Sequence, residues 1–281
     1  GGAQYVHTFD KCFFMPSDLT AGLEYNRDRL KDNMWGYNRH TDQTVNIYSA
    51  FLQNEWKNDR WGILIGGRLD KHNMVDNVIF SPRANLRFNP TQNINLRLSY
   101  SSGFRAPQAF DEDMHIENVG GTVAMIERAK DLKEEKSQSF SVSADMYHRF
   151  GAFQTNLLIE GFYTRLTDVF VLGKPYDRGD GILVKTRSNG PGAKVMGLTL
   201  EGKVAYLSIL QIQAGLTLQR SRYDEPHKWH DDAPAEKKIF RTPDTYGYFT
   251  ATCTPIKPLS IALSGTYTGR MLVQRMDITA E

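Results

Sequence analysis

The chain has 281 residues, of which 40% are hydrophobic and 23% are charged, and its formal net charge is +2. No segment approaches the roughly 18 consecutive apolar residues that a membrane-spanning helix needs, which excludes a helical membrane protein. Lys and Arg are scattered along the chain rather than clustered, which disfavours a nucleic-acid partner.

Segments in which apolar and polar residues alternate follow one another along the chain and predict β-strands. Residues 61–70, 139–147 and 198–206 show the pattern most clearly. These segments are roughly ten or more residues long, whereas strands of globular proteins have a typical length of about 5 to 6. The alternation therefore predicts a sheet of long strands with one apolar and one polar face, as in a barrel surrounded by lipid.

Two kinds of connection join the segments. Tight turns rich in Pro, Gly, Asn, Asp and Ser predict six hairpins, and hence about twelve strands. These turns lie near residues 16–18, 57–60, 89–93, 149–151, 207–208 and 255–258. Longer polar loops lie between the hairpins, at residues 31–42, 71–77, 104–135, 168–194 and 223–242. Short turns at one end and long loops at the other are typical of an antiparallel transmembrane β-barrel in an outer membrane, which is the fold that we predict.

Two details refine this prediction. The apolar residues Val45, Ile47 and Phe51 occupy odd-numbered positions, whereas Ala50, Leu52 and Trp56 occupy even-numbered ones. This change of face predicts a β-bulge in that strand. Aromatic residues beside the tight turns predict a belt at the membrane interface. They are Trp56, Trp61, Phe88, Tyr147, Phe150, Phe153 and Tyr206.

Several motifs resemble those of TonB-dependent outer-membrane receptors, especially receptors of the Bacteroidetes type. Residues 100–107 read Tyr-Ser-Ser-Gly-Phe-Arg-Ala-Pro and resemble the family's Y-x-x-G-F-R-A-P, which closes a strand and opens a large extracellular loop. Residues 132–137 resemble L-x-P-E-x-S, with Glu134 in place of the proline. Further resemblances lie at residues 187–189, 195–202, 240–243 and 267–271, in the family's order.

The resemblance implies a larger barrel of about 22 strands that holds an N-terminal plug. Residues 1–281 would then be an incomplete barrel domain, without the plug and without the first and last strands. We therefore expect two exposed sheet edges, one at each terminal strand, since this number of strands does not close the barrel.

The resemblance also implies the function: TonB-coupled uptake of a scarce, bulky ligand across the outer membrane of a Gram-negative bacterium. The ligand class is a ferric siderophore or another iron or cobalamin complex. The expected partners are outer-membrane lipid, the ligand and the TonB complex, which would be reached through the plug region. We expect no enzymatic activity, catalytic residue, cofactor or resident metal.

Ligand-binding residues are expected in the long loops, where aromatic, Arg and His side chains provide large contact areas with few polar groups. For each group, a solvated or purely structural role is the alternative. The predicted residues are Trp35, Tyr37, His40, Arg105, His115, Tyr223, His227, Trp229 and His230.

Other functions remain as alternatives. A haem receptor of the same family would use a loop histidine as an iron ligand, and His115 follows the Phe-Arg-Ala-Pro box where such a histidine lies. No Asn-Pro-Asn-Leu motif follows it, which counts against haem. A passive porin-like channel would share the barrel but lack the plug. An outer-membrane barrel enzyme would need a Ser/His or Asp/His set, and the sequence offers no convincing one.

Overall fold

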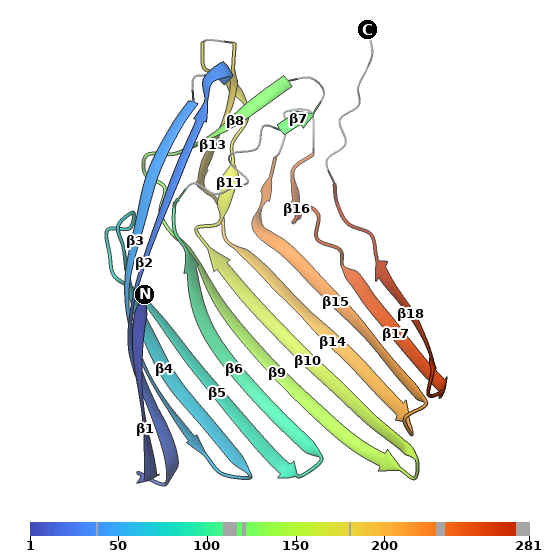
Figure 1. Ribbon diagram of the computed structural model, residues 1–281. Helices are drawn as coiled ribbons and strands as arrows, with labels where there is room; N and C mark the ends of the chain where they lie inside the picture. Colours follow the sequence, from blue (N-terminus) through green and yellow to red (C-terminus); the bar gives the residue numbers. More distant parts are fainter. Residues whose placement is uncertain (38, 109–116, 120–121, 180, 229–233, 274–281) are drawn as a thin grey trace.

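The computed structural model describes residues 1–37, 39–108, 117–119, 122–179, 181–228 and 234–273, without the side chains of residues 37, 117–119 and 122–124 (Figure 1). One large antiparallel sheet dominates the molecule. Its main path has twelve strands in chain order, which confirms the predicted number. They are β1 (Gly2–Cys12), β2 (Met15–Met34), β3 (Arg39–Lys57), β4 (Trp61–His72), β5 (Ile79–Thr91), β6 (Ile94–Arg105), β9 (Glu135–Phe150), β10 (Phe153–Thr167), β14 (Ala193–Tyr206), β15 (Leu210–His227), β17 (Thr245–Ile256) and β18 (Leu259–Thr268).

The sheet is curved and open, with β1 and β18 at its edges, as predicted (Figure 1). The short β16 (Glu236–Lys238) also pairs with β15. In the described residues, no helix is long and apolar enough to cross a membrane.

The loop end contains more regular structure than the sequence predicts. A second, small sheet lies there, with β7 (Glu117–Val119), β8 (Thr122–Arg128), β11 (Phe170–Leu172), β12 (Tyr176–Asp177) and β13 (Leu183–Asn189). Strands β8 and β13 pair in parallel, which departs from the all-antiparallel prediction. Residues 31–42 are not a loop, because β2 and β3 continue their ladder to the Met34–Arg39 pair and only the 3-10 turn η1 (Trp35–Tyr37) connects them.

The predicted β-bulge is wrong. The β2–β3 and β3–β4 ladders run without a register shift through residues 45–56. Apolar residues occur at both odd and even positions of β3 because some apolar side chains also lie on the polar face of the sheet. Val45 is buried there, and the ring of Phe51 covers the space above Gly22 on the neighbouring strand. An aromatic ring over a glycine on the adjacent strand pins the register of a sheet.

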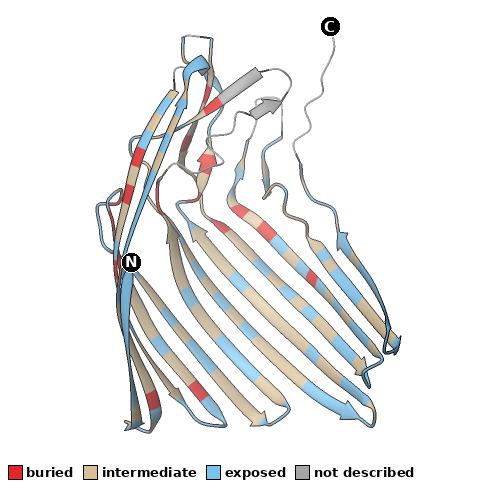
Figure 2. Ribbon diagram, viewed as in Figure 1, coloured by how far each residue is buried: buried red, intermediate tan, exposed pale blue. Residues whose placement is uncertain are grey.

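The two faces of the sheet differ in chemistry as predicted. In β9, Phe140 and Val142 are exposed on the apolar face, whereas Ser139 and Ser141 on the polar face are half-buried. Figure 2 shows that buried positions gather toward the loop end of the large sheet and in the small sheet. There Ala193 and Tyr223, on the polar face, pack with Val169 of the loop region. The polar face is therefore the inner face that the loops cover.

The predicted aromatic belt lies on the outer face, with one exception. Trp61 stacks on Phe88 and Phe153 packs on Tyr206, with ring centroids 4.3 and 4.7 Å apart. Tyr147 instead points to the inner face, where its hydroxyl donates a hydrogen bond to Asp145 Oδ2 at 3.0 Å. Residues 145 and 147 share a face because side chains repeat every second residue along a strand.

Alanine at Gly197 is expected to destabilise the barrel by about 1 to 3 kcal/mol, the usual cost of overpacking. A Cβ at this position would lie 2.5 Å from the Leu218 carbonyl oxygen and 2.6 Å from the Phe162 ring. Gly202→Ala, on the same strand, is the matched control, because no atom lies within 4 Å of its Cβ position. Urea unfolding of the full-length protein in lipid vesicles measures both. Equal midpoints for the two variants would contradict the expected packing.

Candidate functional site

The Phe-Arg-Ala-Pro segment at the end of β6 is held in place by three contacts. Phe104 and Ala106 pack with Val75 of the β4–β5 connection and with Ile79, the first residue of β5. The Arg105 guanidinium lies 5.7 Å from the centroid of the Phe170 ring, a cation–π contact. Arg128 Nη1 donates a hydrogen bond to the Pro107 carbonyl oxygen at 2.8 Å. Through Arg128 and Phe170, the segment therefore connects the end of β6 to the long loops predicted at residues 104–135 and 168–194.

His72 is the most deeply buried titratable side chain near this segment, with only 1% of its surface exposed. Its Nδ1 accepts a hydrogen bond from the Met74 amide at 3.0 Å, so the ring proton lies on Nε2, 3.3 Å from Gln108 Oε1. Burial lowers the pKa of the His72 imidazole, because the charged form loses its hydration there. His72 is thus a neutral hydrogen-bonding group that anchors the residue after the segment.

A polar network lies on the inner face beside His72. Asp70 Oδ1 accepts hydrogen bonds from Ser49 Oγ at 2.6 Å and from Arg68 Nε at 2.9 Å. Arg68 Nη2 also lies 2.7 Å from Glu24 Oε2. The side chain of Asp70 is only 5% exposed, so its charge depends on these partners.

A pocket of 740 Å³ opens at the loop end, between β3, the β4–β5 connection, the Phe-Arg-Ala-Pro segment and β8. Its apolar lining comes from Met74, Pro107, Met125, Ile126 and Leu132. Its cationic and imidazole side chains are Arg39, His40, Arg128, Lys130 and Arg178, and Glu127 is the only acidic residue among the described residues that line it. Its size is that of a typical small-molecule site, and its charge favours an anionic ligand.

The cations of the pocket differ in how they are held. Arg39 Nη2 lies 2.9 Å from Asp32 Oδ2, and Arg178 Nη1 lies 3.5 Å from Glu127 Oε1. Lys130 is exposed and makes no ion pair with the described residues. The pocket thus combines positioned guanidinium groups with an exposed ammonium group, a combination suited to carboxylate or catecholate oxygens.

Of the residues predicted from sequence, His40 lines this pocket. The ring of Trp35 lies 5.0 Å from the ring of His40 in an edge-on arrangement, and Trp35 is 78% exposed. His40 Nδ1 lies 3.1 Å from Asn33 Oδ1. Trp35 and His40 are therefore brought together at the tip of the β2–β3 hairpin, beside the pocket.

The second predicted group lies on another part of the loop end. Tyr223 is buried, and its ring centroid is 6.1 Å from that of His227. Burial lowers the pKa of His227, which lies at the last position of β15, beyond the apolar band of the outer face. Tyr223 packs with Val169 and Ala193 and therefore supports the loops. His115, Trp229, His230 and the side chain of Tyr37 lie outside the described residues.

Sequence reasoning did not identify Arg39, Arg128, Lys130, Arg178 or His72. For His72 a signal existed, since Arg68, Asp70 and His72 alternate on one face of β4. The four pocket cations come from three segments far apart in sequence, with Arg39 in the first, Arg128 and Lys130 in the second and Arg178 in the third. No local pattern relates the three segments. Among the described residues, no group of three or more His, Cys, Asp or Glu side chains could hold a metal ion. The acidic residues 111–113 and residues 230–232 are not described.

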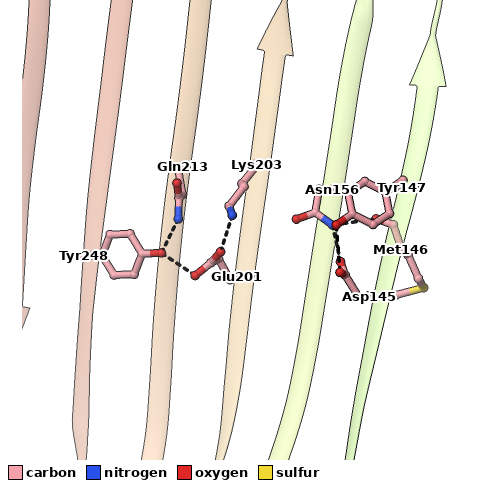
Figure 3. Close-up of polar contacts among 8 residues, drawn as sticks. All are labelled: Asp145, Met146, Tyr147, Asn156, Glu201, Lys203, Gln213 and Tyr248. Carbon is pink, nitrogen blue, oxygen red and sulfur yellow. Dashed lines mark hydrogen bonds and ion pairs between the residues drawn. The ribbon is translucent and has the colours of Figure 1, made fainter. Parts of the chain in front are cut away.

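Further polar side chains form a wall on the inner face near the tight turns (Figure 3). Tyr248 Oη donates to Glu201 Oε2 and accepts from Gln213 Nε2, while Lys203 Nζ lies 3.0 Å from Glu201 Oε1. On the neighbouring strands, Asn156 donates to Asp145. These side chains come from β9, β10, β14, β15 and β17, and strand alternation and register place them on the inner face.

Comparison with known proteins identifies relatives of the chain. A family model described as TonB dependent receptor-like, beta-barrel, matches residues 2–271. The chain is 23% identical over 206 residues to a probable hemoglobin and hemoglobin-haptoglobin-binding protein of Haemophilus influenzae, and the match covers 72% of this chain and 18% of that protein.

Solved structures share the fold. The siderophore receptor PirA from Pseudomonas aeruginosa matches with a TM-score of 0.70 and 17% identity, over 95% of this chain and 48% of PirA. The alcaligin outer membrane receptor FauA from Bordetella pertussis matches with a TM-score of 0.61 and 14% identity, over 96% of this chain and 45% of FauA. The chain thus spans about half the length of the solved receptors that it matches.

Proposed function

Because the chain belongs to the family of TonB-dependent receptors, through its β-barrel domain, we propose that it forms part of the wall of an active transporter for an anionic iron chelate. The transporter lies in the outer membrane of a Gram-negative bacterium, and its ligand class is a ferric siderophore. The single observation that carries this proposal is the cationic pocket at the loop end, where the described lining residues include four Lys and Arg side chains and one carboxylate.

The geometry supports this ligand class. Siderophores bind ferric iron through oxygen anions, so their iron complexes are commonly negatively charged and bulky. A pocket of 740 Å³ with apolar and cationic lining provides contact area and orienting charges together. Guanidinium groups match planar oxygen pairs in a bidentate manner, which favours Arg at such a site.

The domain organisation is part of the same proposal. Residues 1–281 are taken as a portion of a larger barrel whose lumen holds a plug domain. The polar wall of Figure 3 would face that plug, because its Glu, Lys, Tyr, Gln and Asn side chains project from the inner face. TonB would act on the plug and release the ligand into the periplasm, so that transport consumes the inner-membrane proton gradient and no bond is broken.

A growth assay tests the ligand class. The gene is deleted, and the strain is grown with single sources of iron or cobalamin, with and without the full-length gene restored. We expect growth on one or more ferric siderophores to depend on the gene. Dependence on cobalamin alone, or on no iron source, would contradict the proposal.

Haem uptake is the second candidate, favoured by the similarity to a protein named as a hemoglobin-binding receptor. In that case the full-length receptor would shift the Soret band of haemin, and His115→Ala would remove the shift if this histidine binds the iron. For a siderophore receptor we expect no Soret shift in the wild type. A shift of the Soret band on addition of the wild-type receptor would assign haem as the ligand in place of a siderophore.

A further inference from the structure

The outer face carries two rows of aromatic residues that mark the height of an apolar band. The row near the tight turns includes Trp56 and Phe150, and the upper row includes Tyr48 and Phe140. These pairs are 8 and 10 residues apart on their strands. With a rise of about 3.4 Å per residue and a tilt of about 45°, the rows lie roughly 19 to 24 Å apart. This is close to the height of the lipid-facing band of an outer-membrane barrel.

Basic side chains gather on the outer face immediately beyond the upper row. Tyr163 belongs to that row, and the residues at the same register on the next two strands are Met196 and Arg220. One step further from the band, Arg165, Lys194 and Arg222 are direct cross-strand neighbours on β10, β14 and β15. These side chains lie on the same face as Tyr163, because residues two positions apart on a strand point to the same face of the sheet. Three cations in one register row at the edge of the apolar band repel one another unless an anion lies between them.

A pocket of 390 Å³ lies over this row. It is lined by Lys194, Arg220, Arg222 and Lys237, and by one acidic side chain, Asp224. Arg165 Nη1 already donates a hydrogen bond to Asp224 Oδ1 at 2.6 Å, and Arg165 Nη2 forms an ion pair with Asp224 Oδ2 at 2.5 Å. Lys237 Nζ donates to the Asp224 carbonyl oxygen at 2.7 Å.

The other cations of the pocket make weaker contacts with the described carboxylates. Arg222 Nη1 donates to the Ser221 carbonyl oxygen at 3.0 Å. Lys194 and Arg220 make no side-chain hydrogen bond or ion pair with the residues that the structure describes, and Lys194 interacts with Asp224 only through space. Among the described residues, four cationic side chains therefore line the pocket with a single carboxylate, which Arg165 already engages.

An apolar groove of 670 Å³ continues from this pocket toward the membrane band. The groove and the basic pocket share Met196 and Arg220. Gly161 forms the floor of the groove between Val142 and Leu198, its direct cross-strand neighbours. A Cβ at Gly161 would lie 3.6 Å from Val142 Cγ1, so a side chain would fit there and would occupy the groove.

We propose that this composite surface binds a phosphate-bearing, acylated lipid of the outer leaflet, with the phosphate between Lys194, Arg220 and Arg222 and an acyl chain in the groove above Gly161. The position of the cations matches the level of lipid headgroups, since they begin where the aromatic row ends. Arg and Lys at this level recognise phosphate through charge-assisted hydrogen bonds. The site lies on the outer face, whereas the proposed chelate site lies among the loops at the loop end.

Native mass spectrometry of the full-length receptor in neutral detergent tests this proposal. The probes are phosphatidic acid, diacylglycerol with the same acyl chains, and inorganic phosphate. Wild-type protein is expected to retain phosphatidic acid and neither of the other two. Equal retention of diacylglycerol would overturn the phosphate site, and equal retention of inorganic phosphate would overturn the lipid assignment.

Variants separate the two halves of the site. Lys194→Gln is expected to weaken phosphatidic acid binding roughly fivefold, and the triple variant with Arg220→Gln and Arg222→Gln on the order of a hundredfold. Gly161→Leu fills the groove and leaves the cations intact, and we expect a roughly tenfold loss.

The control neutralises Lys11 and Lys257, two exposed residues at the tight-turn end of the sheet. Heat-modifiable mobility in gels confirms that each variant is folded. If the triple variant does not fold, the effect of Lys194→Gln on phosphatidic acid binding is compared with that of the control pair instead. Losses no larger than those of the control pair would overturn the proposal.

Discussion

Reversing the charges of Lys130 and Arg178 is expected to weaken binding of an anionic ferric chelate by a hundredfold or more. Both side chains line the loop-end pocket. Each reversal replaces attraction by repulsion, and a unit charge at about 6 Å in an effective dielectric near 20 changes the energy by several kcal/mol. Part of this is lost to solvent screening at the exposed Lys130, which lowers the expected effect to on the order of a hundredfold. Quenching of tryptophan fluorescence in the full-length receptor measures the affinity.

The control for this prediction reverses Lys11 and Lys257, which lie at the opposite end of the sheet. It changes the net charge equally and is expected to leave the affinity within about twofold, because the distance far exceeds a Debye length of roughly 8 Å. Lys130→Glu alone is informative as well, since this exposed side chain has no ion pair to lose among the described residues. If the double reversal at Lys130 and Arg178 and the single variant Lys130→Glu both bind the chelate as tightly as the control and the wild type, the chelate binds elsewhere.

Asp70→Ala is expected to destabilise the barrel by about 3 kcal/mol. The substitution removes the acceptor of two hydrogen bonds, from Ser49 and Arg68, and leaves the half-buried Arg68 with Glu24 alone. Breaking a buried pair by removing one partner typically costs 3 to 5 kcal/mol. The partial exposure of Arg68 places the expected value at the lower end.

Asp42→Ala is the matched control for Asp70→Ala. Asp42 also accepts two hydrogen bonds from an arginine on an adjacent strand, Arg29, at 2.7 and 3.1 Å. Both side chains of this pair are exposed, so we expect no measurable change in the urea midpoint. If the two variants lose equal stability, burial does not set the strength of the Asp70 network.

The hairpins could be predicted from sequence because each depends on neighbouring residues. Alternation assigns the faces of strands such as β9, and turn residues such as those at 149–151 mark where the chain reverses. The prediction failed where long-range packing decides. The parallel pairing of β8 with β13 joins residues about 60 positions apart, and the local sequence of neither strand indicates which strand it pairs with.

The same distinction holds for the site. The Phe-Arg-Ala-Pro segment was recognisable as a motif, and its neighbour His40 was identified by residue type within a loop. Arg128 belongs to the small sheet and Arg178 follows its strand β12, so both reach the pocket only through tertiary packing at the loop end. The contact of Phe51 with Gly22 explains why Val45, Ile47 and Phe51 mimicked a bulge, since apolar side chains were filling the inner face.

TonB-coupled transport is tested most directly by the uptake of a ferric chelate labelled with radioactive iron. Cells expressing the full-length gene are compared with cells that lack TonB and with cells treated with a protonophore. We expect saturable uptake that is lost in both comparisons, while binding of the chelate at the cell surface persists. Uptake that continues without TonB, or that rises linearly with chelate concentration, would contradict TonB-coupled transport and indicate a passive channel.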